Sequence, residues 1–228
     1  MGTSSPSIVE RHLMTRRSGS RVGFVVLVFV LGAATFVAGC SLSTFRVTLP
    51  APSQTSRIPV TRAPARGDVI SVVRPKGQGE NVEIGDVVSD KGRSVRTVVA
   101  SLNDPGLWVA NTLIAGLQRA GYQVEFVENV QSATTERVIA VDVIDVSARM
   151  QAGFIDFTEM SQVIARVRVY NRSEQILDRK YSGTHRTRFG FLLTHYNEDE
   201  FERSLDLAMT DFLDRALPDL TAFLAAHQ

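Results

Sequence analysis

Residues 162–170 read QVIARVRVY, and this stretch decides the fold. Valine and alanine fall on one face of an extended chain while glutamine, arginine and tyrosine fall on the other, which is the period-two pattern of a half-buried strand. Upstream, residues 138–150 (VIAVDVIDVSARM) form a second, Val-rich strand. Its alternation slips near Val143 and Ile144, which predicts a β-bulge or burial on both faces.

A third strand follows in the chain. Residues 171–174 (NRSE) have the polar composition of a turn, and residues 176–187 return as a strand. The three segments together predict an antiparallel meander.

Two helices are expected beside these strands. Asp104 can cap a helix that begins at Pro105 and ends at Gly121, and a strand at 122–127 follows at once. A closing helix begins at Asn197, with Glu200 at the capping-box spacing.

A short apolar run at 69–73 adds a buried strand before the first helix. The order is strand, helix, strand, meander, helix. This order predicts an α+β fold: a mostly antiparallel sheet with two helices packed on one face.

The N-terminal segment has the features of a secretory signal. No charged residue lies between Val22 and Gly39, and four arginines precede this run. A transmembrane anchor is the alternative, because about 18 apolar residues lie at the lower limit of a membrane span. The sequence VAGC, which ends at Cys40, favours a lipoprotein, since small residues before a cysteine resemble the bacterial lipobox. Met1 and Met14 both remain possible starts.

Acylation of Cys40 would place several lipid chains in the bilayer, and the anchor would be effectively permanent. Cys40 is the only cysteine, so the folded part has no disulfide. By resemblance to lipoprotein sorting rules, Ser41 favours the outer membrane with the domain facing the periplasm. Removing residues 1–39 takes away four arginines and one glutamate and changes the net charge from +1 to −2. A near-neutral body argues against nucleic-acid binding.

The chain divides into three parts. Residues 1–39 form the lipoprotein signal peptide, residues 40–66 the lipidated cysteine with a Pro-rich tether, and residues 67–228 a single α+β domain. A short edge strand at 45–49 is the alternative for the start of the tether.

Several of these segments resemble a known family, the YajG-type lipoproteins that face the periplasm. The likeness covers the lipobox, the TLP segment at 48–50, the first strand, GLQRAGYQV at 116–124, the meander and the acidic last helix. The element order is also similar to activators of peptidoglycan synthases and to auxiliary lipoproteins of lipid-export systems. The resemblance implies an envelope protein with no catalytic signature.

The residues themselves indicate little chemistry. The histidines that remain after residue 39, namely His185, His195 and His227, lack metal-ligand spacing. Asp142 and Asp145 are three apart on a strand, so they converge only if the bulge intervenes; solvent contact or ion pairs with Arg166 or Arg168 is the simpler interpretation. We expect no enzyme, no metal and no cofactor.

Two features suggest binding. Cations gather on the meander, and an anion such as a lipopolysaccharide phosphate is the candidate ligand of Arg166, Arg168 and Arg186. Solvation, or loose pairing with the acidic last helix, is the alternative. Apolar loops end two of the strands, and their candidate contacts with a protein or lipid are Phe154, Ile155, Phe189, Phe191 and Leu192. The alternative is that these loops fold back onto the core.

These features support two functions. The first is a non-catalytic interaction domain that serves a protein partner in envelope assembly or maintenance. The second is an auxiliary lipoprotein of phospholipid or lipopolysaccharide transport. A continuous apolar groove between sheet and helix would favour transport, and a closed core with a surface patch would favour the interaction domain. A third alternative, an envelope hydrolase, would require a polar cleft in which histidine and aspartate converge.

Overall fold

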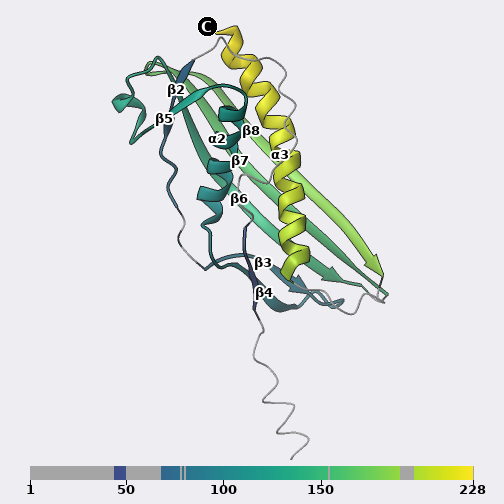
Figure 1. The fold of residues 1–228 in the computed structure, drawn as a ribbon. Coiled ribbons are helices and arrows are strands. Elements are labelled where there is room, and N and C mark those ends of the chain that lie inside the picture. Colours follow the sequence, from purple (N-terminus) through teal and green to yellow (C-terminus); the bar gives the residue numbers. More distant parts are fainter. Residues whose placement is uncertain are drawn as a thin grey trace, which may run out of the picture. The chain divides into compact units, whose positions relative to one another are not determined.

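The computed structural model describes residues 44–49, 68–77, 79, 81–153, 155–190 and 198–227, all within one compact unit of the chain. Figure 1 shows its elements. In chain order they are β1 (Phe45–Val47), β2 (Val69–Val73), β3 (Val82–Val88), β4 (Ser94–Ala100), α2 (Pro105–Arg119), β5 (Gln123–Val127), the 3-10 turn η2 (Val130–Ser132), β6 (Arg137–Ala152), β7 (Asp156–Asn171), β8 (Glu174–Gly190) and α3 (Glu198–Ala226).

The eight strands form one sheet with β6 at its centre. β7 pairs antiparallel along one side of β6, and β8 pairs antiparallel with β7, as the meander predicts. On the other side of β6, β2 pairs with its beginning and β3 with its end, both parallel. β1 and β5 add further parallel pairs, to β4 and β2 respectively.

The fold is therefore α+β, but the sheet is mixed, and the prediction of a mostly antiparallel sheet is wrong. The physical reason is that alternation in the sequence gives information about neighbouring strands only. Alternation along the meander identifies strands that follow one another, whereas β2 and β3 pair with a strand that lies far along the chain.

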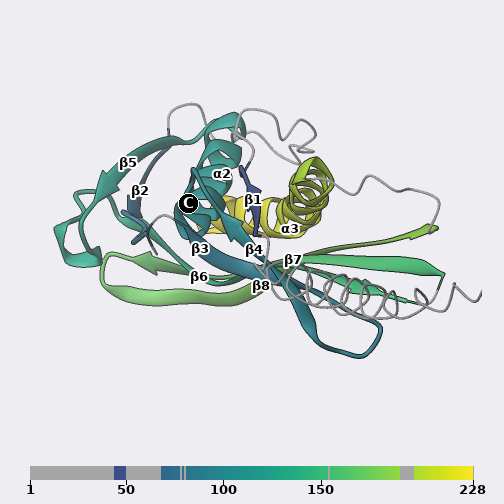
Figure 2. The same cartoon turned by 90° about the horizontal axis from the view of Figure 1, so that it is seen from below.

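Both helices lie on the same face of the sheet (Figure 2), as predicted. α2 begins as its sequence indicates: Asp104 caps it by accepting a hydrogen bond from the Leu107 N–H at 2.9 Å, and Pro105 is its first residue. α3 runs from Glu198 to Ala226 with Pro218 inside it. Neither helix in the described part of the chain is both long and apolar enough to cross a membrane.

The interface between the middle of α3 and the sheet is closely packed. The apolar face of β7 is fully buried beneath the helix, and so are Leu205, Met209 and Phe212 of α3. At Gly183 of β8 the two backbones nearly touch, because a Cβ atom there would lie 2.1 Å from the Ala208 carbonyl oxygen. Only glycine allows this approach.

The bulge predicted near Val143 and Ile144 is confirmed. The register of β6 against β7 shifts between Val143 and Asp145, which leaves Ile144 as the additional residue. Ile144 is 51% exposed. The bulge reverses the parity of the strand, so that Asp142 and Asp145 lie on the same face.

The folded domain begins earlier than residue 67. Phe45–Val47 is a strand of the sheet, paired in register with Val98–Ala100 of β4, and Leu49 is also buried. The structure therefore contains a short edge strand here, which was the alternative to a tether that starts before residue 45. Phe45 packs on Phe201 of α3 with ring centroids 5.4 Å apart, so apolar burial holds this segment to the domain. Cys40 and residues 50–67 lie outside the described residues.

Candidate functional site

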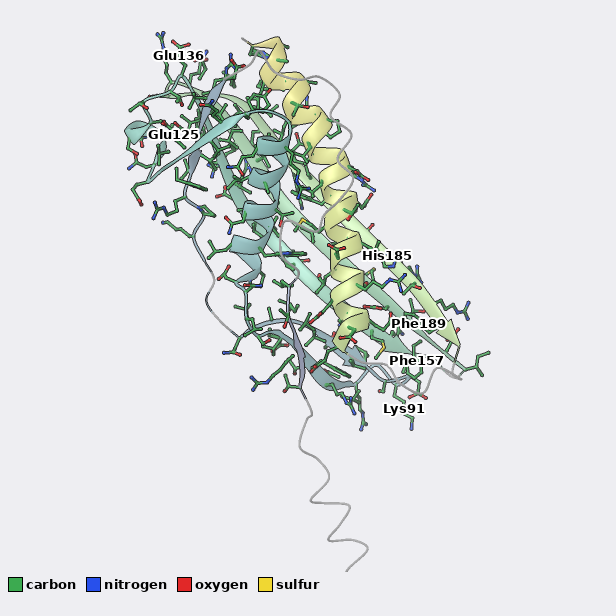
Figure 3. The ribbon with its side chains drawn as sticks, viewed as in Figure 1. Lys91, Glu125, Glu136, Phe157, His185 and Phe189 are labelled. Atoms are coloured by element: carbon green, nitrogen blue, oxygen red, sulfur yellow. The ribbon has the colours of Figure 1, made fainter. Side chains whose placement is uncertain are left out.

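The candidate apolar contacts that the structure describes lie at one end of the sheet. Phe157 on β7 lies opposite Phe189 on β8, and both appear near the strand ends in Figure 3. Ile155, in the turn between β6 and β7, is 67% exposed, whereas Phe189 is half-buried. Phe154, Phe191 and Leu192 lie outside the described residues. We call this end, which includes the β3–β4 and β6–β7 turns, the turn end.

A buried polar cluster lies under the beginning of α3 near the turn end. Glu159 and Ser161 of β7 are fully buried, and the Ser204 hydroxyl of α3 donates to the Ser161 Oγ at 2.8 Å. Glu159 and Ser204 line a hollow of about 240 Å³ together with His185, Thr187, Phe189, Glu200, Arg203 and Leu207. This cluster was not predicted from the sequence. The alternation of β7 contains the signal, because Ser161 and Glu159 lie two and four residues before Val163 and therefore on the same inward face.

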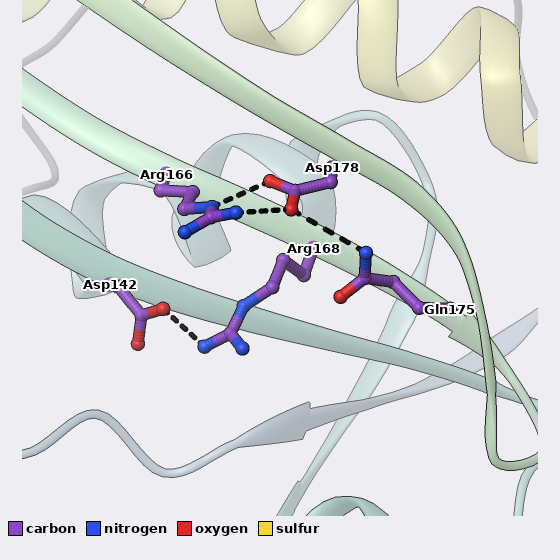
Figure 4. A network of polar contacts seen from close by, with 5 residues as sticks. All are labelled: Asp142, Arg166, Arg168, Gln175 and Asp178. Atoms are coloured by element: carbon purple, nitrogen blue, oxygen red, sulfur yellow. Dashed lines mark hydrogen bonds and ion pairs between the residues drawn. The ribbon is translucent and has the colours of Figure 1, made fainter.

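The meander arginines are largely occupied by acids on the same sheet (Figure 4). Arg166 donates to both carboxylate oxygens of Asp178, at 2.7 and 2.5 Å, and these bonds lower the pKa of Asp178. Arg168 pairs with Asp142. The two parallel hydrogen bonds between Arg166 and Asp178 fix both of these side chains. The simpler interpretation of Asp142 as an ion-pair partner is therefore confirmed.

One arginine of the meander reaches the acidic helix. Arg179 on β8 pairs with Asp219 on α3, and the Tyr181 hydroxyl donates to the same carboxylate. Burial, together with that bond, raises the pKa of Tyr181. Burial alone would raise the pKa of Asp219 as well, but the hydrogen bonds from Tyr181 and Arg179 outweigh it and lower the pKa.

The three candidate anion contacts do not form one site. Arg166 and Arg168 are bonded to acids. Arg186 lies further along the sheet, on β8 opposite Met160, and has no acid partner within the described ranges. An external anion would have to compete with Asp178 or Asp142 for the charge of the first two.

The two aspartates share a face and have different partners. Asp142 is held by Arg168, and Asp145 accepts a hydrogen bond from the Ser147 hydroxyl at 2.8 Å. Among the described residues, no group of three or more histidine, cysteine or acidic side chains is placed to hold a metal ion.

A larger hollow, about 510 Å³, lies beside the middle of β6. In the described part of the chain, residues 140–147 of β6 are paired on the β7 side only, because β2 pairs up to Ile139 and β3 starts at Ala148. The hollow lies against 140–143 and is also lined by the segments 73–76 and 128–131 and by Gly106, Arg168 and Tyr170. This open strand edge depends on long-range pairing and was not predicted.

Comparisons with known proteins add structural likeness only. No protein-family model matches the chain, and no curated protein matches it. Among solved structures, the protein XCC0632 of Xanthomonas campestris, of the family DUF330, matches over 82% of this chain and 99% of its own, with 6% identity and a TM-score of 0.49.

Two further solved structures are lipoproteins by name. A minor lipoprotein from Acinetobacter baumannii matches over 70% of this chain and 92% of its own, with 12% identity and a TM-score of 0.35. Lipoprotein GNA1162 from Neisseria meningitidis matches over 71% and 99%, with 14% identity and a TM-score of 0.28. At these values neither a family nor a function is transferred to this chain.

Proposed function

We propose that this protein is a bacterial lipoprotein that is acylated at Cys40 and holds a non-catalytic interaction domain on the periplasmic side of the outer membrane. One observation carries the proposal: β1 begins at Phe45, five residues after Cys40. Removal of a signal peptide that ends at Gly39 would thus leave every residue of the described fold in place. The VAGC sequence and the resemblance to YajG-type lipoproteins support the same proposal.

The closed core favours an interaction domain over a lipid carrier. A carrier would need an apolar groove for acyl chains, and the natural place for one is between the helices and the sheet. There the inward apolar side chains of β7 and the facing side chains of α3 are fully buried, and Gly183 brings the backbones of β8 and α3 into contact. The hollow under the beginning of α3 is lined mainly by polar side chains and is not an apolar groove. A surface that binds a protein partner of envelope assembly or maintenance fits this packing better.

The hollow beside β6 is the surface that we assign to this partner. Strand edges with unpaired backbone groups bind extended segments of other proteins by adding a strand. The open edge at 140–147 meets that requirement, and the hollow gives room for side chains of the added segment. Lys76, Asn129 and Gln131 would supply polar contacts at its rim.

The anchor is tested by metabolic labelling. Cells that express the full chain are grown with labelled palmitate, and the wild-type protein is expected to carry label in its processed form. Cys40→Ser removes the sulfur that accepts the lipid, so it should carry no label and remain unprocessed. Ser41→Ala is the matched control and should be labelled as the wild type is. A wild-type protein without label would refute the proposal.

The partner surface is tested by photo-crosslinking in the intact envelope. A photoreactive residue at Gln131 lies at the hollow, and one at Asn111 lies on the exposed side of α2. We expect a discrete protein adduct from position 131 and none from position 111. Adducts from position 111 alone would place the partner elsewhere.

A further inference from the structure

We propose that the turn end of the domain rests on the bilayer surface, with Ile155 among the lipid headgroups and the cations of the β3–β4 turn beside the lipid phosphates. The inference rests on the proposed acylation of Cys40. It adds an orientation: the domain lies against the membrane instead of standing away from it on a tether.

Strand directions place the anchor at the turn end. β1 runs parallel to β4, and β4 begins at the β3–β4 turn, so the chain enters β1 from the side of that turn. β3 runs parallel to β6, so both strands finish at this same end. Val88 lies beside Gln151, directly before the β6–β7 turn. The two turns and the path from Cys40 therefore share one end of the sheet.

Chain length brings that end to the membrane. The five residues from Cys40 to Phe45 span at most about 18 Å when fully extended. Phe45 lies beside Val98, and β4 reaches four residues further back to Ser94, about 13 Å toward the anchor, before the turn itself is counted. The acylated sulfur can therefore lie only a few ångströms further out than the turns. The turns must then lie close to the lipid headgroups.

The chemistry of the turn end suits an anionic lipid surface. Lys91, Arg93 and Arg96 lie within six residues in and after the β3–β4 turn, with Asp90 as the one acid of that segment. None of the three cations has an acid partner within the described ranges. Val95 is exposed on β4, and Ile155 is exposed in the β6–β7 turn. Cations with neighbouring apolar side chains are the composition of membrane-surface segments.

Two acids near this end are paired with other arginines. Asp156 pairs with Arg188, and Asp86 pairs with Arg149 at 2.9 Å. These two carboxylates therefore do not cancel the cations of the β3–β4 turn. Glu198 of α3 accepts a hydrogen bond from the Arg46 backbone N–H at 2.7 Å and keeps its charge. Figure 3 places Lys91, Phe157 and Phe189 at this end, and the acidic pair Glu125 and Glu136 at the opposite end.

Tryptophan quenching tests the orientation. The full lipidated chain is reconstituted in vesicles of phosphatidylethanolamine, phosphatidylglycerol and brominated phosphatidylcholine, with tryptophan placed at Ile155. Trp108 is the only native tryptophan and is 4% exposed, so the wild-type protein supplies the background. Insertion among the headgroups predicts an about twofold loss of the added emission and a blue shift.

Phe126→Trp is the matched control. Phe126 is 48% exposed on β5 and lies level with Ile139, thirteen residues of β6 before its end at the β6–β7 turn. That separation is about 40 Å, so brominated lipid should leave its emission unchanged. Equal and negligible quenching of the two variants would overturn the proposed orientation.

A third variant tests the cations. Lys91→Glu with Arg93→Glu, in the Ile155→Trp background, should weaken quenching in phosphatidylglycerol vesicles and have little effect in vesicles without anionic lipid. Quenching that is unchanged in both would refute the role of these two cations. Palmitate on the reconstituted protein is measured in the same sample. Protein without palmitate refutes the proposed function, whereas acylated protein with an unquenched tryptophan refutes the orientation alone.

Discussion

Gly183→Ala tests whether α3 is fixed against the sheet, on which the closed core depends. The new Cβ atom would lie 2.1 Å from the Ala208 carbonyl oxygen and 2.2 Å from the Phe212 N. Ordinary contacts of carbon with other heavy atoms begin near 3.5 Å, so α3 would have to move by roughly 1.4 Å. Both obstructing atoms belong to backbone and cannot rotate away.

The expected cost follows from that overlap. Overpacking costs about 1–3 kcal/mol, and rigid neighbours place this site at the upper end, about 3 kcal/mol. Alanine also restricts the unfolded chain, which offsets about 0.5–1 kcal/mol. We therefore expect a net loss of about 2 kcal/mol in the free energy of unfolding.

Gly190→Ala is the matched control on the same strand. No atom lies within 4 Å of a Cβ there, so only the unfolded-state gain applies. Urea unfolding of the mature chain with Cys40 replaced by serine should separate the two variants by about 3 kcal/mol, or about 1.5 M in midpoint. Midpoints that agree within about 0.25 M would refute the reasoning, because α3 could then move away from β8 and open a groove.

Two further predictions concern polar contacts. Asp219 has a lowered pKa in the folded protein, so the stability it contributes is present above its unfolded pKa and is lost as the pH falls through its folded pKa. Asp219→Asn should therefore lower the urea midpoint at pH 7, and the difference should shrink as the pH falls below the ordinary pKa of an aspartate. Asp214→Asn, at an exposed position of α3, should have little effect at any of these pH values. Ser204→Ala should lower the free energy of unfolding by about 1–2 kcal/mol, because it leaves the buried Ser161 hydroxyl without the hydrogen bond from Ser204. The double variant Ser161→Ala with Ser204→Ala should recover part of this loss in the same urea assay. A double variant less stable than either single variant would contradict this account.

Local patterns predicted the elements that depend on neighbours in the chain. Alternation gave β7 and its pairing with β8, and the Asp104–Pro105 pair gave the start of α2. The slip in alternation near Ile144 gave the bulge. Each of these features is decided by residues within one strand, helix or hairpin, so the sequence around it contains the necessary information.

The remaining features depend on which distant strands meet. β2 and β3 share one side of β6, and the open edge between them exists only because neither reaches its middle. No alternation pattern encodes that choice of partner. The inward position of Glu159 was open to prediction from the parity of β7, but an apolar face that turns polar near its end looks like the end of a strand in sequence.

The ion pairs on the sheet affect where an anionic partner can bind. An anion at Arg166 would compete with Asp178, which accepts two charge-assisted hydrogen bonds, and an anion at Arg168 would compete with Asp142. Each exchange replaces one carboxylate by another anion and gains little. The cations of the β3–β4 turn have no such competitor among the described residues, and their charge is available to an external surface. The number of arginines on the meander is thus a poor guide to anion binding, because two of the three candidates are paired with acids and only Arg186 is without an acid partner in the described ranges. Further cations that can attract an anionic membrane lie where the chain enters from Cys40.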